Sequence, residues 1–121
     1  MTTPADLLRA AEGLVGGGAS GAKGAWSRAA ALLTRQAIEA SLTDLWTRRS
    51  PGVATCPARI QLICLPAAGL DGDVARQVRH IWAVLSAACH HHPYDVAPSS
   101  HELREWIRVA ARLHRVVCSP E

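Results

Sequence analysis

The sequence predicts an all-α protein, a single helical domain spanning residues 1–121 and built as an up-down bundle of four to five helices. Apolar residues recur every three or four positions over several long segments, which is the spacing of amphipathic helices. The apolar fraction of 49% and the charged fraction of 19% are those of a globular chain. The length of 121 residues fits one domain with a buried core.

The first expected element is an N-terminal helix over residues 1–15. Thr3 is placed to cap it, Pro4 to occupy its first position, and Asp6 to add negative charge to its first turn. Five glycines fall within residues 16–24, so this stretch is expected to be a glycine-rich linker. Residues 25–117 then form the core bundle.

The segment 25–49 has the clearest helical pattern and is the longest element. Ser50, Pro51 and Gly52 follow it and are expected to end it. At about 1.5 Å per residue, this helix would be near 35 Å long. Its expected inward residues are Trp26, Ala30, Leu33, Ala37, Ile38, Leu42, Leu45 and Trp46.

Segment 56–65 is compatible with a strand by composition, but no second strand is available to pair with it. We therefore predict a short helix that starts near Pro57 and ends at Pro66. A turn over 69–73 leads to a helix over 73–90, followed by a loop over 91–99. Ser99 and Glu102 match a capping box, which predicts a last helix over 100–117.

Composition excludes several classes of protein. No apolar run approaches the roughly 18 residues of a membrane span, and the first residues lack the apolar core of a signal peptide. We expect a cytoplasmic protein whose four cysteines are reduced. The chain has twelve arginines and one lysine, a bias also produced by a high-GC genome. Its net charge of +3 permits contact with nucleic acid without requiring it.

The run from Cys89 to Asp95 gathers titratable side chains at the end of a predicted helix. His90, His91, His92, Tyr94 and Asp95 are candidate catalytic residues, with Arg79 as a candidate for stabilising phosphate charge. Cys89, His90 and His92 are candidate metal ligands, although adjacent residues on a helix diverge by about 100°. The structural alternative is that the histidines end the helix, where its dipole favours them.

The last predicted helix carries a second candidate site. Four arginines at spacings of four, four and three residues share one face, beside the apolar one. Such a face can neutralise phosphates, or it can simply be solvated. These candidate nucleic-acid-binding residues are Arg104, Arg108, Arg112 and Arg115. Four tryptophans on predicted helices are expected to pack in the core or at a dimer interface.

The stretch Arg28–Glu39 resembles the long first core helix of HEPN-like domains, including an R-x-A-x-E pattern at Arg35, Ala37 and Glu39. Residues 86–90 resemble the later histidine region of that family. The overall pattern is also similar to small uncharacterised actinobacterial helical proteins. The resemblance implies a helical bundle that commonly dimerises and acts in toxin–antitoxin or phage-defence systems. It also implies that active members are metal-independent ribonucleases, whereas others bind RNA or protein.

The catalytic arginine of the family motif has no counterpart before His90, where the relevant positions are Ala83, Val84 and Leu85. Arg108 and His114 match the spacing, but residues six apart diverge on a continuous helix. Our leading hypothesis is therefore a non-catalytic, dimeric module without a cofactor that binds a protein partner or RNA. The alternatives are an endoribonuclease toxin using His90–His92 and a metal-binding sensor.

Overall fold

A computed structural model of the chain describes residues 2–17, 25–90 and 96–119. Over these residues it is all-helical, with no strand. Its elements are α1 (Pro4–Gly16), α2 (Ala25–Arg49), α3 (Pro51–Ala54), α4 (Ala58–Ile63), the 3₁₀ turn η1 (Leu65–Ala68), α5 (Gly72–Cys89) and α6 (Ser100–Cys118). The all-α prediction is confirmed, and the described residues contain six α-helices rather than four or five.

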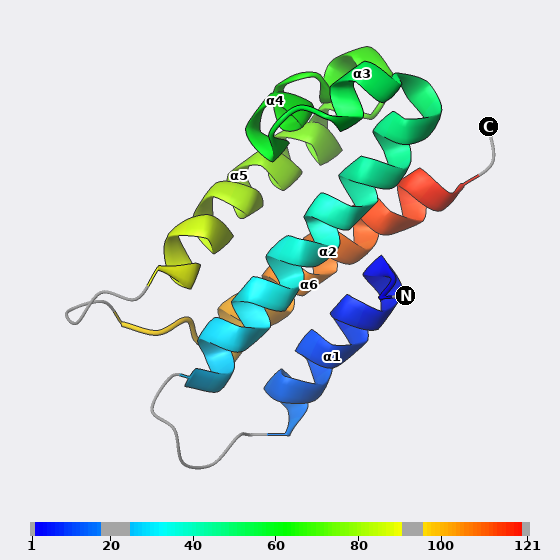
Figure 1. Cartoon of the computed structure of the whole chain (residues 1–121). Helices are drawn as coiled ribbons and strands as arrows, with labels where there is room; N and C mark the ends of the chain where they lie inside the picture. The colour runs from blue at the N-terminus through cyan, green and yellow to red at the C-terminus, as the bar shows by residue number, and fades with distance from the viewer. Residues whose placement is uncertain (1, 18–24, 91–95, 120–121) are drawn as a thin grey trace.

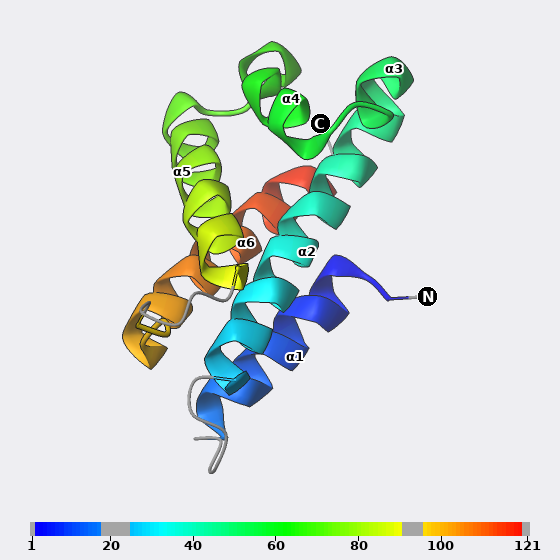
Figure 2. The same ribbon diagram turned by 60° about the vertical axis from the view of Figure 1, so that its left-hand side comes forward.

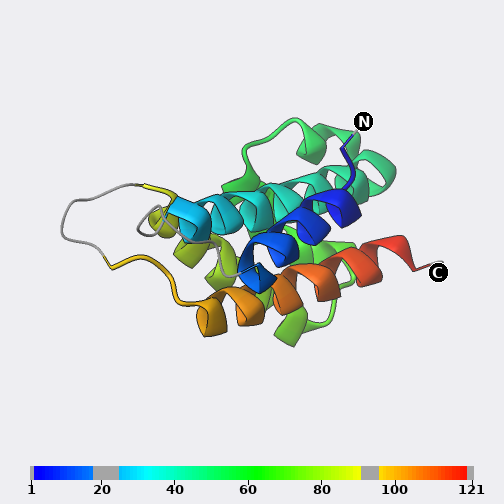
Figure 3. The same cartoon turned by 90° about the horizontal axis from the view of Figure 1, so that it is seen from below.

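The four long helices lie side by side around one core (Figure 1). The long α2 occupies the centre of the molecule and packs against α1, α5 and α6. The short elements α3, α4 and η1 gather at one end, where they connect α2 to α5 (Figures 1 and 2). A view along another direction shows α1 lying against both α2 and α6 (Figure 3).

Local chemistry explains where the long helices begin. The Thr3 hydroxyl accepts a hydrogen bond from the Asp6 amide, and the Asp6 carboxylate accepts one from the Thr3 amide, both at 3.1 Å. Ser99 and Glu102 form the same reciprocal pair at the start of α6. Both predicted caps are therefore confirmed. Gly16 is the last residue of α1, and residues 18–24 of the expected linker lie outside the described part of the chain.

The connection between α2 and α5 contains more structure than the sequence predicted. Ser50 is extended, but Pro51 starts the single turn of α3 rather than only ending α2. Pro66 likewise lies in the first turn of η1. Proline has a helical φ and needs no amide partner in a first turn, so each proline both ends one element and starts the next. Gly69 then reverses the chain with φ of 83°, a conformation that favours glycine.

The core matches the expected apolar faces closely. On the last helix, six apolar residues recur at three- and four-residue spacing, and all six are buried in α6: Leu103, Trp106, Ile107, Ala110, Leu113 and Val117. Trp46 and Trp106 are buried, whereas Trp26 and Trp82 are partly buried against the core. The tryptophans of this chain thus contribute to core packing. Three hydroxyl residues at seven-residue intervals on α2 are also buried, and the apolar pattern did not predict them: Ser27, Thr34 and Ser41.

Candidate binding groove and arginine face

The four predicted arginines lie on the exposed side of α6. The residues at positions 104, 108, 112 and 115 are all exposed. At 100° per residue they fall within about 80° of one another, opposite the buried stripe rather than beside it. We call this set the α6 arginine face.

Two arginines of this face have partners. Arg108 pairs with Glu105 three residues earlier on α6. Arg112 donates a hydrogen bond of 3.2 Å to Oε1 of Gln77 and so links α6 to α5. For Arg104 and Arg115, no hydrogen-bonding or ionic partner is found within the described ranges. Half of the arginine face is therefore available for a ligand without breaking an existing contact.

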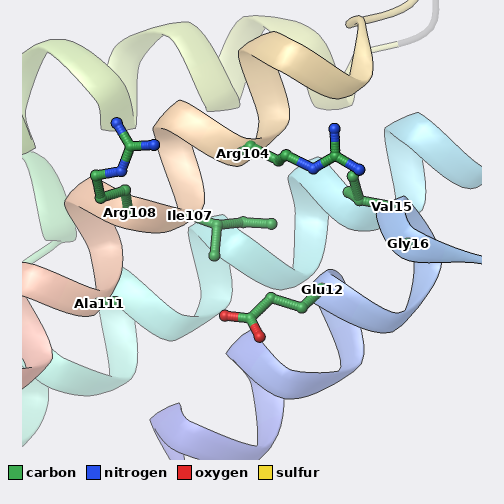
Figure 4. Close-up of a pocket in the computed structure, with 7 residues that line it drawn as sticks. All are labelled: Glu12, Val15, Gly16, Arg104, Ile107, Arg108 and Ala111. Carbon is green, nitrogen blue, oxygen red and sulfur yellow. The ribbon is translucent and has the colours of Figure 1, made fainter.

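Beside this face, a groove of about 410 Å³ runs between α1 and α6 (Figure 4). Its apolar lining comes from both helices, with Val15 on α1 and with Ile107 and Ala111 on α6. Figure 4 shows Arg104 extending toward the end of α1 at Gly16. Because carbonyl groups are unpaired at a helix C-terminus, this end attracts a cation.

Charged groups of both signs border the groove. Arg104 and Arg108 come from α6, and Glu12 comes from α1 with its carboxylate directed toward α6 (Figure 4). An apolar lining with charges at its edge suits a ligand that has an apolar group flanked by charged ones. The two arginines could be predicted from their spacing, but Glu12 and Val15 could not, because the sequence does not show that α1 packs against α6.

The predicted histidine site is only partly described. His90 is the C-cap residue of α5, with an extended backbone and an exposed side chain, as expected for a residue that ends the helix. It lines a hollow of about 250 Å³ together with Arg28 of α2 and with Glu102 and Trp106 of α6. The other candidates His91, His92, Tyr94 and Asp95 lie outside the described residues.

Arg79, the predicted partner for phosphate charge, is not brought to His90. Both residues are on α5, eleven positions apart, which corresponds to about 16 Å along the helix axis. The arginine that shares a hollow with His90 is Arg28 instead. Sequence spacing could not identify it, because the two residues line the same hollow only when α2 packs against α5.

Arg35 and Glu39, two residues of the pattern that resembles HEPN-like domains, form a polar cluster with Trp82 between α2 and α5. Nε1 of Trp82 donates to Oε2 of Glu39 at 3.1 Å, and Nε of Arg35 lies 3.7 Å from the same oxygen. Burial raises the pKa of the nearby Cys89 thiol, an effect that Arg35 opposes. A raised pKa leaves less of the thiolate form that would bind a metal or attack a substrate. This cluster links two core helices.

The candidate metal ligands Cys89 and His90 are not joined by a third ligand in the described part of the chain. No group of three or more histidine, cysteine or acidic side chains there is arranged to hold a metal ion. All four cysteines are free thiols. A thiol does contact an imidazole at the end of α6, between Cys118 and His114. This pair is not among the metal ligands predicted from the sequence.

Comparison with known proteins does not identify a family for this chain. No family model matches the chain, and no match was found among curated proteins or among solved structures. In the described parts of the chain, no helix combines the length and the apolar character needed to cross a membrane. The groove and the arginine face must therefore be interpreted from their own chemistry.

Proposed function

We propose that this chain is a non-catalytic, HEPN-like helical module with an up-down arrangement, and that it binds a protein partner through the α1–α6 groove. The observation that carries the proposal is the pairing of an apolar lining with two arginines at the edge of the same groove. The matching partner presents an apolar side chain flanked by acidic ones. The HEPN resemblance extends this proposal to a dimeric protein that acts in a toxin–antitoxin or phage-defence system.

Charge balance at the groove supports a protein partner over RNA. Glu12 borders the groove, and Glu105 already pairs with Arg108. Both carboxylates lower the positive potential that a phosphate backbone would require. An apolar lining adds little to phosphate binding, whereas it supplies the buried centre of a protein interface.

RNA binding is the second candidate function, and the exposure of all four arginines on one side of α6 favours it. Each phosphate contact would make the affinity depend strongly on salt. A third candidate is a ribonuclease, since His90 and Arg28 line one hollow and could act as general acid–base and phosphate ligand. The metal-sensor hypothesis has the least support, because Cys89 is partly buried with a raised thiol pKa.

The proposal is tested by placing a photo-crosslinking amino acid at Ala111, inside the groove, in cells that express the chain naturally. The matched control carries the same group at Thr43, on the exposed side of α2. We expect one protein to be crosslinked from position 111 and not from position 43. That protein is then purified, and its affinity for the wild-type chain is compared with its affinity for Arg104→Glu/Arg108→Glu.

Arg59→Glu on α4 is the control variant. Loss of binding in the double variant, with binding unchanged in Arg59→Glu, supports binding through the α1–α6 groove. Two results overturn the proposal. One is an affinity that the double variant leaves unchanged. The other is tight, salt-sensitive binding of a single-stranded RNA oligonucleotide with no crosslinked protein, which would assign the arginine face to RNA. Cleavage of that RNA, lost in His90→Ala, would favour the ribonuclease.

A further inference from the structure

The end of α6 carries a thiol and an imidazole in contact. Sγ of Cys118 lies 3.6 Å from Nδ1 and 3.8 Å from Nε2 of His114. The two residues are four positions apart on one helix, so both side chains project from the same face. Cys118 is exposed and His114 is partly exposed, so the pair is open to a ligand from solvent.

A cysteine and a histidine four positions apart on one helix can reach the same tetrahedral zinc ion. With Zn–S near 2.3 Å and Zn–N near 2.0–2.1 Å, a tetrahedral angle places sulfur and nitrogen about 3.5–3.6 Å apart. Because Sγ is nearly as close to Nε2 as to Nδ1, it does not lie near the lone-pair direction of either nitrogen, and the ring must turn before the pair can share an ion. Rotation of the imidazole about its last side-chain torsion, which is soft in histidine, would direct a nitrogen lone pair at that ion.

The surroundings of Cys118 leave room for an ion and further ligands. The cysteine lines a hollow of about 440 Å³ between the ends of α2 and α6, together with Asp44, Thr47, Arg48 and Val117. Arg48 is held there by hydrogen bonds to the carbonyl groups of Asp44 and Val117. Asp44 does not complete a three-ligand group with the pair within the described residues.

We propose that His114 and Cys118 form half of a zinc site, and that the same pair of a second copy of the chain completes it. A closed zinc site needs four ligands, and two chains related by a twofold axis supply two sulfurs and two nitrogens. Each thiol releases one proton on binding, so two thiolates balance the charge of Zn²⁺. Sulfur and imidazole ligands together select zinc over magnesium or calcium. This site is separate from the α1–α6 groove.

The test uses the full chain without a histidine tag, kept reduced, and cobalt as a spectroscopic substitute for zinc. We expect a thiolate-to-cobalt charge-transfer band, the visible absorption of tetrahedral cobalt, and saturation at one ion per two chains. Sedimentation with zinc should then show a dimer. His114→Ala and Cys118→Ser should each weaken metal binding more than about tenfold, since even an outer-shell change costs about that much, and the metal-induced dimer should decrease with it.

The control variants are Cys89→Ser and His90→Ala, which remove ligands at the other candidate site and should leave both signals unchanged. Circular dichroism checks that each variant is folded. Three results would overturn the proposal: no cobalt–thiolate band, a band that persists in Cys118→Ser, or one ion per chain without a change in mass. A band lost only in the control variants would move the metal to the end of α5 and equally exclude this site.

Discussion

Replacement of Ser41 by alanine should stabilise the fold. Ser41 is fully buried on α2, and its hydroxyl has no hydrogen-bond partner. A buried hydroxyl without a partner costs about 1–3 kcal/mol, and alanine is the better helix former by about 0.5 kcal/mol. Removing the oxygen also loses its van der Waals contacts, which contribute about 0.1–0.2 kcal/mol for each atom pair. We expect a net stabilisation of about 1 kcal/mol.

Thermal unfolding followed by circular dichroism measures this effect. For a chain of this length, about 1 kcal/mol corresponds to a rise in Tm of about 3–5 °C. Thr34 is the matched control, because it is equally buried on the same helix but its hydroxyl donates to the Ala30 carbonyl at 2.8 Å. Thr34→Ala should therefore destabilise the fold. A Tm for Ser41→Ala at or below that of the wild-type chain would refute the argument.

Three further predictions concern the core, the first helix cap and the thiols. Leu103 is fully buried, so Leu103→Ala should lower the free energy of unfolding by about 3 kcal/mol in urea titration; a loss under about 1 kcal/mol would contradict its place in the core. Hydrogen bonds with the backbone and side chain of Thr3 lower the pKa of the Asp6 carboxyl group. The Asp6 carboxylate therefore stabilises the fold near neutral pH, and this contribution is lost as the pH falls through the lowered pKa. Asp6→Asn should flatten this part of the stability–pH curve, and an unchanged curve would exclude the cap as its source. Because burial raises the pKa of Cys89 while Cys118 is exposed, iodoacetamide should label Cys118 first in mass spectrometry, and the reverse order would be evidence against the described packing.

The sequence predicted the long helices well because periodicity and capping are local signals. The inward face of α6, its capping box and the Thr3 cap of α1 could be identified from residues within a few positions of each other, whereas the reciprocal bond from Asp6 to Thr3 was not predicted. The short elements were harder to predict. Pro51 and Pro66 were interpreted as terminators, yet proline is equally suited to a first turn, and only the packed chain decides between these roles.

The candidate site depended on contacts that a single sequence does not display. The arginines of α6 could be found by spacing, but the groove beside them exists only because α1 packs against α6. Glu12 has no distinguishing pattern in the sequence. Arg28 likewise lines the same hollow as His90 only because α2, α5 and α6 pack together there. By contrast, His114 and Cys118 are four residues apart, and a search for metal ligands at helical spacing would have found them.

The most direct test of the proposed binding function is an NMR titration of the isotopically labelled chain with the protein that is crosslinked from the groove. At 12.9 kDa the chain is small enough for complete amide assignment. We expect the largest chemical-shift changes on Glu12 and Val15 of α1 and on Arg104, Ile107 and Ala111 of α6. Changes centred instead on the hollow around His90, with the α1–α6 groove unaffected, would contradict the proposed binding function.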